Sequence, residues 1–215
     1  MANKNIGNVF ILGDSYSTYE GWIPEGYAVY YEQNGNPEEG KLPDVSQTWW
    51  KQLAKMTGAD LVMNNSWSGS TICKTGYEGV HCEASAYVTR VQQYLNGGKC
   101  GDQPVDTALI FGGTNDCWAG APHGTLKYAD WTEEDLAQVA PATCFLLDYM
   151  KTHNPTVRTV VIVNCDLTAE VTAILTDACR HYGVECVRLA QIEKQDGHPN
   201  IAGMTQIAEQ IYAAL

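Results

Sequence analysis

Basic residues are scarce in this chain. Only 13 of its 215 residues are Lys or Arg, against 25 Asp or Glu, so the formal net charge is −12. Proteins that bind nucleic acid need clustered cations to neutralise the phosphate backbone. The charge balance therefore makes nucleic acid a poor partner.

Long apolar runs are missing as well. No stretch approaches the roughly 20 apolar residues that a membrane-spanning helix needs, and residues 1–5 lead straight into a predicted strand instead of the apolar core of a signal peptide. We therefore expect no membrane partner and a cytoplasmic location, unless a leader was trimmed. Low-complexity tracts and runs of like charge are also absent, which is typical of one globular domain over residues 1–215.

Paired metal-ligand spacings are absent, although cysteines are numerous. The eight cysteines are scattered along the chain, without the close pairs of a zinc site, so we expect free thiols and no metal. One alternative stays open. Cys73 and Cys82 flank a glycine-containing loop, and they could form a disulfide in an oxidising compartment.

Five short apolar runs rich in β-branched residues predict strands, at residues 9–12, 61–63, 105–111, 157–163 and 184–189. Helical spacing of apolar residues follows at residues 49–56, 87–95, 136–150, 171–178 and 201–215. Strands that alternate with helices form a parallel sheet covered on both faces. We therefore predict a three-layer α/β/α sandwich with a five-stranded parallel sheet, in which ligands bind at the carboxyl ends of the strands.

A long segment, residues 16–46, separates the first predicted strand from the first predicted helix. It is rich in Gly and Pro, and its aromatic residues include Trp22, Tyr27, Tyr30 and Tyr31. Insertions of this length inside compact domains are usually functional or mobile. The aromatic rings could form one wall of a substrate cleft or could anchor the segment to the body, and the sequence leaves both readings open.

Four short blocks carry the polar residues that follow the strands or precede the last helix. They are Gly13-Asp14-Ser15, Asn64-Asn65-Ser66-Trp67-Ser68-Gly69, Gly112-Gly113-Thr114-Asn115-Asp116 and Asp196-Gly197-His198-Pro199-Asn200. Together and in this order they resemble the SGNH hydrolases, also called the GDSL esterase and lipase family. The resemblance implies a flavodoxin-like SGNH hydrolase fold and a serine esterase that forms an acyl-enzyme without a metal or organic cofactor.

The resemblance assigns a role to the residue that follows each of the first three strands. Ser15 is the predicted nucleophile, and its backbone N–H is also a predicted oxyanion donor. Gly69 is the second donor, because a glycine lets the backbone approach a ligand closely. The side-chain amide of Asn115 is the third, and these three groups form the predicted oxyanion hole.

His198 is the predicted general base. The following Pro199 favours extended backbone at His198 and is suited to open the final helix, which holds the imidazole at the carboxyl edge of the sheet. The other histidines lack such a context. Among them only His123 lies near the third block, and it is a weaker second candidate.

The predicted acid is Asp196, with one departure from the family pattern. The family places its acid three residues before the histidine, whereas Asp196 stands two residues before His198. Side chains two apart on an extended chain point to the same side, so we predict that the carboxylate reaches the imidazole Nδ1. If it points away, a backbone carbonyl orients the ring in a Ser–His dyad; Glu193 and Asp166 are more distant alternatives.

The substrate expectation rests on aromatic residues near the blocks. Trp67, Trp118 and Trp22 are predicted to bind substrate. Core packing is the alternative for Trp67 and Trp118, and anchoring of the long segment is the alternative for Trp22. An acidic chain without a basic amphipathic helix is unsuited to a lipid interface, so we expect a short acyl group on a polar scaffold such as a sugar, with O-acetyl carbohydrate first.

Three other functions stay open at this point. A lipase or thioesterase for longer acyl chains is the enzymatic alternative, and a non-catalytic carbohydrate-binding relative is the alternative from another class. A flavodoxin-like cofactor carrier is less favoured, because the first loop lacks a phosphate cradle and Asp14 would repel an anion. The oligomeric state is not predicted.

Overall fold

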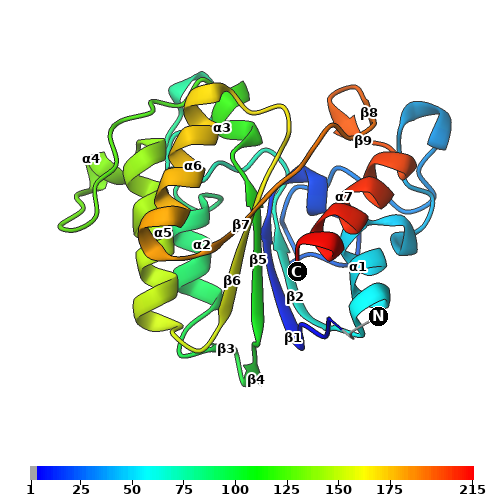
Figure 1. Cartoon of the computed structure of the whole chain (residues 1–215). Coiled ribbons are helices and arrows are strands. Elements are labelled where there is room, and N and C mark those ends of the chain that lie inside the picture. The colour runs from blue at the N-terminus through cyan, green and yellow to red at the C-terminus, as the bar shows by residue number, and fades with distance from the viewer. Residues whose placement is uncertain (1–3) are drawn as a thin grey trace.

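The sheet of the molecule has five strands, all parallel. The computed structural model describes residues 4–215, and the strand order is β2-β1-β5-β6-β7 (Figure 1). The bounds are β1 Asn8–Gly13, β2 Asp60–Ser66, β5 Thr107–Gly112, β6 Arg158–Val163 and β7 Glu185–Arg188. The predicted five-stranded parallel sheet is therefore confirmed. Because the chain goes from β1 to β2 on one side and then to β5 on the other, the order reverses between β1 and β5.

Helices cover both faces of this sheet, as predicted. One layer holds α1 (Trp49–Thr57) and α7 (Ile201–Ala214), which pack on each other; the other holds α2 (Tyr87–Tyr94), α5 (Val139–His153) and α6 (Ala169–Tyr182) (Figure 1). The interior strand β1 serves both layers, since alternate side chains of a strand point to opposite faces. Phe10 and Leu12 join the core under α2, α5 and α6, whereas Val9 and Ile11 join the core under α1 and α7.

Short polar side chains set where the main helices begin. The side chains of Thr48, Thr168 and Asn200 accept backbone N–H groups in the first turns of α1, α6 and α7, which satisfies amides that have no partner inside the helix. Two glycines with positive φ, Gly58 and Gly183, end α1 and α6. Because Asn200 follows Pro199 directly, the start of α7 also fixes the end of the block that carries His198.

The structure differs from the prediction where elements are short. The predicted helix at 136–150 is two helices, α4 (Glu133–Leu136) and α5, because Gln138 adopts extended backbone between them. Helix α3 (Thr114–Trp118) and the hairpins β3 (Lys99–Cys100)/β4 (Gln103–Pro104) and β8 (Lys194–Gln195)/β9 (His198–Pro199) are too short to show a period. The same holds for the 3-10 turns η1 (Ser15–Ser17), η2 (Pro37–Glu39), η3 (Val45–Gln47) and η4 (Tyr77–Gly79).

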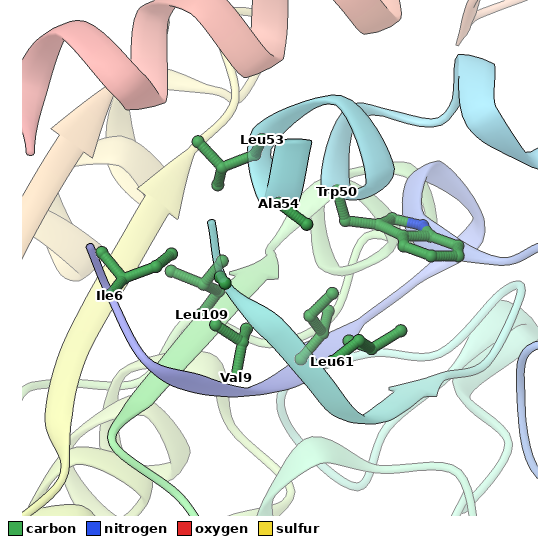
Figure 2. A pocket seen from close by; sticks show the side chains of 9 residues that line it. Ile6, Val9, Trp50, Leu53, Ala54, Leu61 and Leu109 are labelled. Atoms are coloured by element: carbon green, nitrogen blue, oxygen red, sulfur yellow. The ribbon is translucent and has the colours of Figure 1, made fainter. Parts of the chain in front are cut away.

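Apolar side chains fill almost all of the space between α1 and the sheet. The small hollow that remains there is the pocket of Figure 2, and it has a volume of ≈ 10 Å³. Only apolar residues line it: Ile6, Val9, Ile11, Trp50, Leu53, Ala54, Ala59, Leu61 and Leu109. A hollow of this size is at the limit for one water molecule. It is part of the packed core and not a ligand site.

The cysteines and the lengths of the helices bear on two expectations from the sequence. The eight cysteines in residues 4–215 are free thiols; the Cys73 thiol donates to the carbonyl of Thr75 and the Cys82 thiol to that of Val80. No helix in the described part of the chain is both long and apolar enough to cross a bilayer.

Candidate active site

The end of β1 places Ser15 at the carboxyl edge of the sheet. Asp14 caps the 3-10 turn η1, and its carboxylate accepts the N–H of Tyr16 at 3.0 Å. This turn directs the Ser15 Oγ toward the hairpin β8/β9, where it lies 2.9 Å from the Nε2 of His198. The structure thus brings the predicted nucleophile and the predicted base into hydrogen-bond contact.

The other imidazole nitrogen contacts the backbone. The His198 Nδ1 lies 3.1 Å from the carbonyl oxygen of Asp196. Because a carbonyl can only accept, the proton resides on Nδ1, and Nε2 is left to accept the serine proton. The arrangement is the Ser–His dyad that was the alternative to a carboxylate triad.

The expected contact between the Asp196 carboxylate and the imidazole is absent from the described residues, because the chain is not extended there. Gln195 pairs with His198 across a two-residue turn, with φ of +49° at Asp196 and +76° at Gly197. Asp-Gly is a favoured pair for such turns. The turn leaves the carboxylate exposed and aims the carbonyl at the ring.

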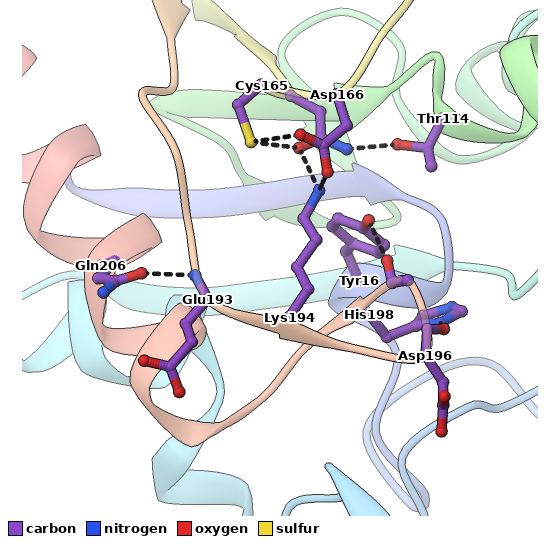
Figure 3. A network of polar contacts seen from close by, with 11 residues as sticks. Tyr16, Thr114, Cys165, Asp166, Glu193, Lys194, Asp196, His198 and Gln206 are labelled. Carbon is purple, nitrogen blue, oxygen red and sulfur yellow. Dashed lines mark hydrogen bonds and ion pairs between the residues drawn. The ribbon is translucent and has the colours of Figure 1, made fainter.

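The two more distant acids have other partners. Glu193 accepts a hydrogen bond from the Asn200 amide at 2.6 Å, and Asp166 forms an ion pair with Lys194 (Figure 3). The second candidate base, His123, is exposed and shows no contact with Ser15 among the described residues. Neither acid therefore supports the base.

Two tyrosines of the long segment and a residue that follows β6 anchor the hairpin. The Tyr16 hydroxyl donates to the carbonyl of Gly197 at 2.5 Å, as Figure 3 shows, and the Tyr31 hydroxyl donates to that of Pro199 at 2.7 Å. The Lys194 ammonium donates to Asn164 at 3.2 Å. These contacts hold the two ends of the β8/β9 turn against the body.

The three predicted oxyanion donors keep hydrogen-bonding capacity. In the hydrogen bonds of residues 4–215, neither the Ser15 amide nor the exposed Gly69 amide donates to a protein acceptor. The φ of Gly69 is +80°, a backbone conformation that glycine adopts without strain. The buried Asn115 amide donates one proton to the Ser70 carbonyl at 3.0 Å, which leaves its second proton free.

A residue that sequence reasoning missed orients this amide. The Tyr77 hydroxyl donates to the Asn115 Oδ1 at 2.7 Å. Together with the bond to the Ser70 carbonyl, this contact fixes which side of the amide carries the NH₂ group. A tyrosine in the loop between β2 and α2 gives no local signal of such a role.

Arg90 in α2 joins the segments that carry the three donors. Its side chain is fully buried, and all five of its N–H groups are used. Nε donates to the Ser85 carbonyl, Nη1 to the carbonyl and side chain of Asn65, and Nη2 to the Gly13 carbonyl and the Ser70 hydroxyl, at 2.6–3.1 Å. Gly13 precedes the serine turn, and Ser70 follows Gly69 and accepts from Asn115. The sequence signal was a charged residue inside the apolar stripe of the 87–95 helix.

Similarity to known proteins extends over nearly the whole chain. The profile of the GDSL-like lipase/acylhydrolase family matches residues 7–215. The chain belongs to this family. Two solved structures, described as GDSL-like lipases from Bacteroides ovatus ATCC 8483 and Bacteroides uniformis ATCC 8492, are each 40% identical over 97% of this chain, cover 97% and 95% of their own chains, and have TM-scores of 0.89 and 0.88. No curated protein matched.

A more distant likeness concerns the fold alone. A family two carbohydrate esterase from Clostridium thermocellum, solved in complex with cellohexaose, is 17% identical over 96% of this chain and 62% of its own, with a TM-score of 0.58. The activity follows from the family and not from this likeness: as a member of the GDSL-like family, this protein is a hydrolase of ester bonds.

Two buried acids adjoin Ser15 and Asn115 in the chain of this GDSL-like hydrolase. Asp116 accepts the amides of Ile72 and Cys73 at 3.0 and 3.3 Å. Burial raises the pKa of Asp116 to about 6 and that of Asp14 to about 7. Both carboxyls contact backbone amides, so they shape the loops around Ser15 and are not an acid/base couple.

The three predicted tryptophans of the hydrolase have different places. Trp118 is 46% exposed, and its ring centroid lies 5.6 Å from that of His198. Trp67 precedes Gly69 by two residues and packs on Tyr27, with centroids 4.0 Å apart. Trp22 instead lies against Trp50 of α1, with centroids 5.8 Å apart, so the structure does not bring it to the imidazole. Trp22 is 41% exposed, so it is not buried in the core, and its contacts with Trp50 and Lys51 anchor the long segment to α1.

Proposed function

We propose that this GDSL-like hydrolase is a serine esterase that removes short acyl groups, O-acetyl first, from carbohydrate or a similar polar scaffold. The observation that carries the proposal is the 2.9 Å contact between Ser15 Oγ and His198 Nε2 beside three N–H donors with free capacity. A serine hydroxyl attacks an acyl carbon only with a positioned base and oxyanion donors.

The proposed reaction has two halves. The Ser15 oxygen attacks the ester carbonyl while His198 Nε2 takes its proton; the amides of Ser15 and Gly69 and the side chain of Asn115 stabilise the oxyanion. The imidazolium then protonates the leaving alcohol, and an acyl-enzyme remains. Water, activated by the same imidazole, releases the acid. The Asp196 carbonyl holds the Nδ1 proton throughout, in the position that a carboxylate has in a triad.

The substrate class rests on the side chains around the donors. Trp118 and Tyr77 are 46% and 43% exposed, and both lie beside Asn115. Flat, exposed rings suit the apolar faces of sugars, and the chain carries a net charge of −12 with few cations for an anionic lipid surface. A carbohydrate esterase among the structures that share the fold supports the same class. The partner proposed is a glycan ester, without nucleic acid or membrane.

The test compares the purified wild-type protein with Ser15→Ala on 4-nitrophenyl acetate and on an acetylated xylo-oligosaccharide. We expect Ser15→Ala to lower kcat by about 10⁴-fold or more, whereas the matched control Ser46→Ala, at an exposed serine, keeps wild-type activity. Activity that survives in Ser15→Ala would refute the nucleophile. A series of 4-nitrophenyl esters from two to sixteen carbons tests the acyl group, and a maximum at long chains would favour a lipase instead.

A further inference from the structure

The faces of the His198 ring are held by aromatic side chains. The two hydrogen bonds of the imidazole lie at its nitrogens and leave the ring free to tilt about the line between them. Tyr30 stacks on one face, with ring centroids 3.5 Å apart and an interplanar angle of 11°. Tyr16 and Trp118 approach at 5.4 and 5.6 Å with steep angles of 56° and 67°. Tyr30 is therefore the ring that sets the plane of the base.

Lys41 occupies the opposite face of Tyr30. Its Nζ lies 3.3 Å from the Tyr30 centroid, and it also donates to the Tyr30 carbonyl at 3.4 Å. The imidazole and the ammonium cannot share one face at these distances, because they would overlap. The three side chains thus form a stack in the order Lys41, Tyr30, His198, and the ammonium is attracted to the ring face.

The backbone of Tyr30 is tied to the nucleophile. Its N–H donates to the Thr18 hydroxyl at 3.0 Å, and that hydroxyl donates to the Ser15 carbonyl at 3.1 Å. The next residue, Tyr31, donates its hydroxyl to the Pro199 carbonyl of the hairpin. The long segment therefore contacts both the serine turn and the strand that carries His198, and Tyr30 lies between them.

We propose that Tyr30 is a positioning residue for the general base: the Asp196 carbonyl holds the Nδ1 proton, the Tyr30 ring face fixes the plane of the imidazole, and Lys41 contacts Tyr30 from the opposite face. The inference rests on the proposed esterase reaction. It also gives the long segment a part in catalysis, since the residues that hold the imidazole plane come from residues 16–46.

The charges around the stack predict a pH effect. The charged or titratable groups that face His198 are Tyr16, Tyr30, Lys41, Lys194 and Asp196. The pKa of His198 lies below its usual value, chiefly because burial disfavours the imidazolium, and the two ammonium groups act in the same direction. Lys194 is paired with Asp166, whereas Lys41 has no ion pair among the described residues. Loss of Lys41 should therefore shift the titration of the base to higher pH.

The test measures kcat, KM and pH profiles on 4-nitrophenyl acetate. We expect Tyr30→Leu to lower kcat by about 10- to 100-fold with little change in KM, because a misplaced base slows the chemical step. Tyr30→Phe keeps the ring and should stay within about twofold of wild type. Lys41→Met should move the acid limb of kcat/KM to higher pH.

The molecule offers matched controls. Tyr128 stacks on His181 at 3.7 Å and 13°, and the Lys51 Nζ lies 3.6 Å over Trp22. Tyr128→Leu and Lys51→Met remove the same kinds of contact elsewhere and should leave kcat and the profile unchanged. Unchanged kcat in Tyr30→Leu, or an unmoved acid limb in Lys41→Met, would overturn the proposal for that residue.

A second measurement separates this inference from the esterase proposal. Histidine ring NMR in the Ser15→Ala background, with the His198 signal assigned through His198→Gln, follows the imidazole without turnover. Tyr30→Leu should remove the upfield ring-current shift of His198, and Lys41→Met should raise its titration midpoint. If these shifts appear while the wild-type protein cleaves no ester, the stack is right and the esterase is wrong; if turnover exists without these shifts, the positioning role is wrong.

Discussion

The two halves of the candidate active site are built in different ways. The half with the proposed oxyanion donors lies where β1, β2 and β5 end, and its backbone is joined by the fully buried Arg90. The base half is a two-residue turn near the surface, and it is held by rings from the long segment. Core packing thus determines the donors, whereas a surface segment determines the base. Substitutions can affect one half without the other.

The largest expected effect comes from breaking the buried half. Arg90→Lys keeps the charge, but an ammonium has three donors for the five acceptors that Arg90 satisfies. We expect the free energy of unfolding to fall by about 2–4 kcal/mol, because buried acceptors lose their donors. We also expect kcat to fall by about 100-fold, because the Ser15 turn and Ser70 shift together.

Urea unfolding and kcat on 4-nitrophenyl acetate check this prediction. The control is Arg158→Lys, since Arg158 forms a partly exposed ion pair with Glu185 at the edge of the sheet, and such pairs contribute little. If Arg90→Lys loses stability and retains full kcat, Arg90 supports the fold and not the donors.

The next effect is on a single donor. Tyr77→Phe removes the hydroxyl that orients the Asn115 amide and leaves the ring in place. A hydrogen bond of this kind contributes about 0.5–1.5 kcal/mol, so we expect kcat to fall by about 2- to 10-fold at nearly constant KM. Tyr77 is 43% exposed, and the melting temperature should hardly change. Steady-state kinetics with thermal unfolding decide the point: an unaltered kcat would show that the Ser70 carbonyl alone orients the amide.

The contrast between the halves also explains what could be predicted from the sequence. Ser15 and Asn115 follow strands that are visible as apolar runs, and parallel strands bring their carboxyl ends to one edge. The sheet and the residues that follow the carboxyl ends of its strands were therefore predictable. Arg90 was not assigned a role, because four of its five acceptors belong to residues at least 20 positions away in the chain.

The prediction for the half that carries His198 was wrong at one local turn and missed one long-range contact. Asp196-Gly197 was interpreted as extended chain, although this pair favours a two-residue turn, and the turn exchanges the carboxylate for the carbonyl. The stack of Tyr30 on His198 joins residues at opposite ends of the chain. No period or motif in residues 16–46 distinguishes Tyr30 from Tyr27 or Trp22.

The smallest expected effect is the sharpest test of the dyad. In a triad the carboxylate orients the histidine, and its conversion to an amide costs about 10⁴-fold in kcat. In this site the orienting group is the Asp196 carbonyl, which Asp196→Asn leaves untouched. Asn also tolerates the positive φ of +49° at this position, so the turn should persist. We therefore expect kcat and the acid limb of the pH profile to stay within about twofold of wild type. A loss of 100-fold or more would mean that the carboxylate rotates onto Nδ1 during turnover, and the base half would then work as a triad after all.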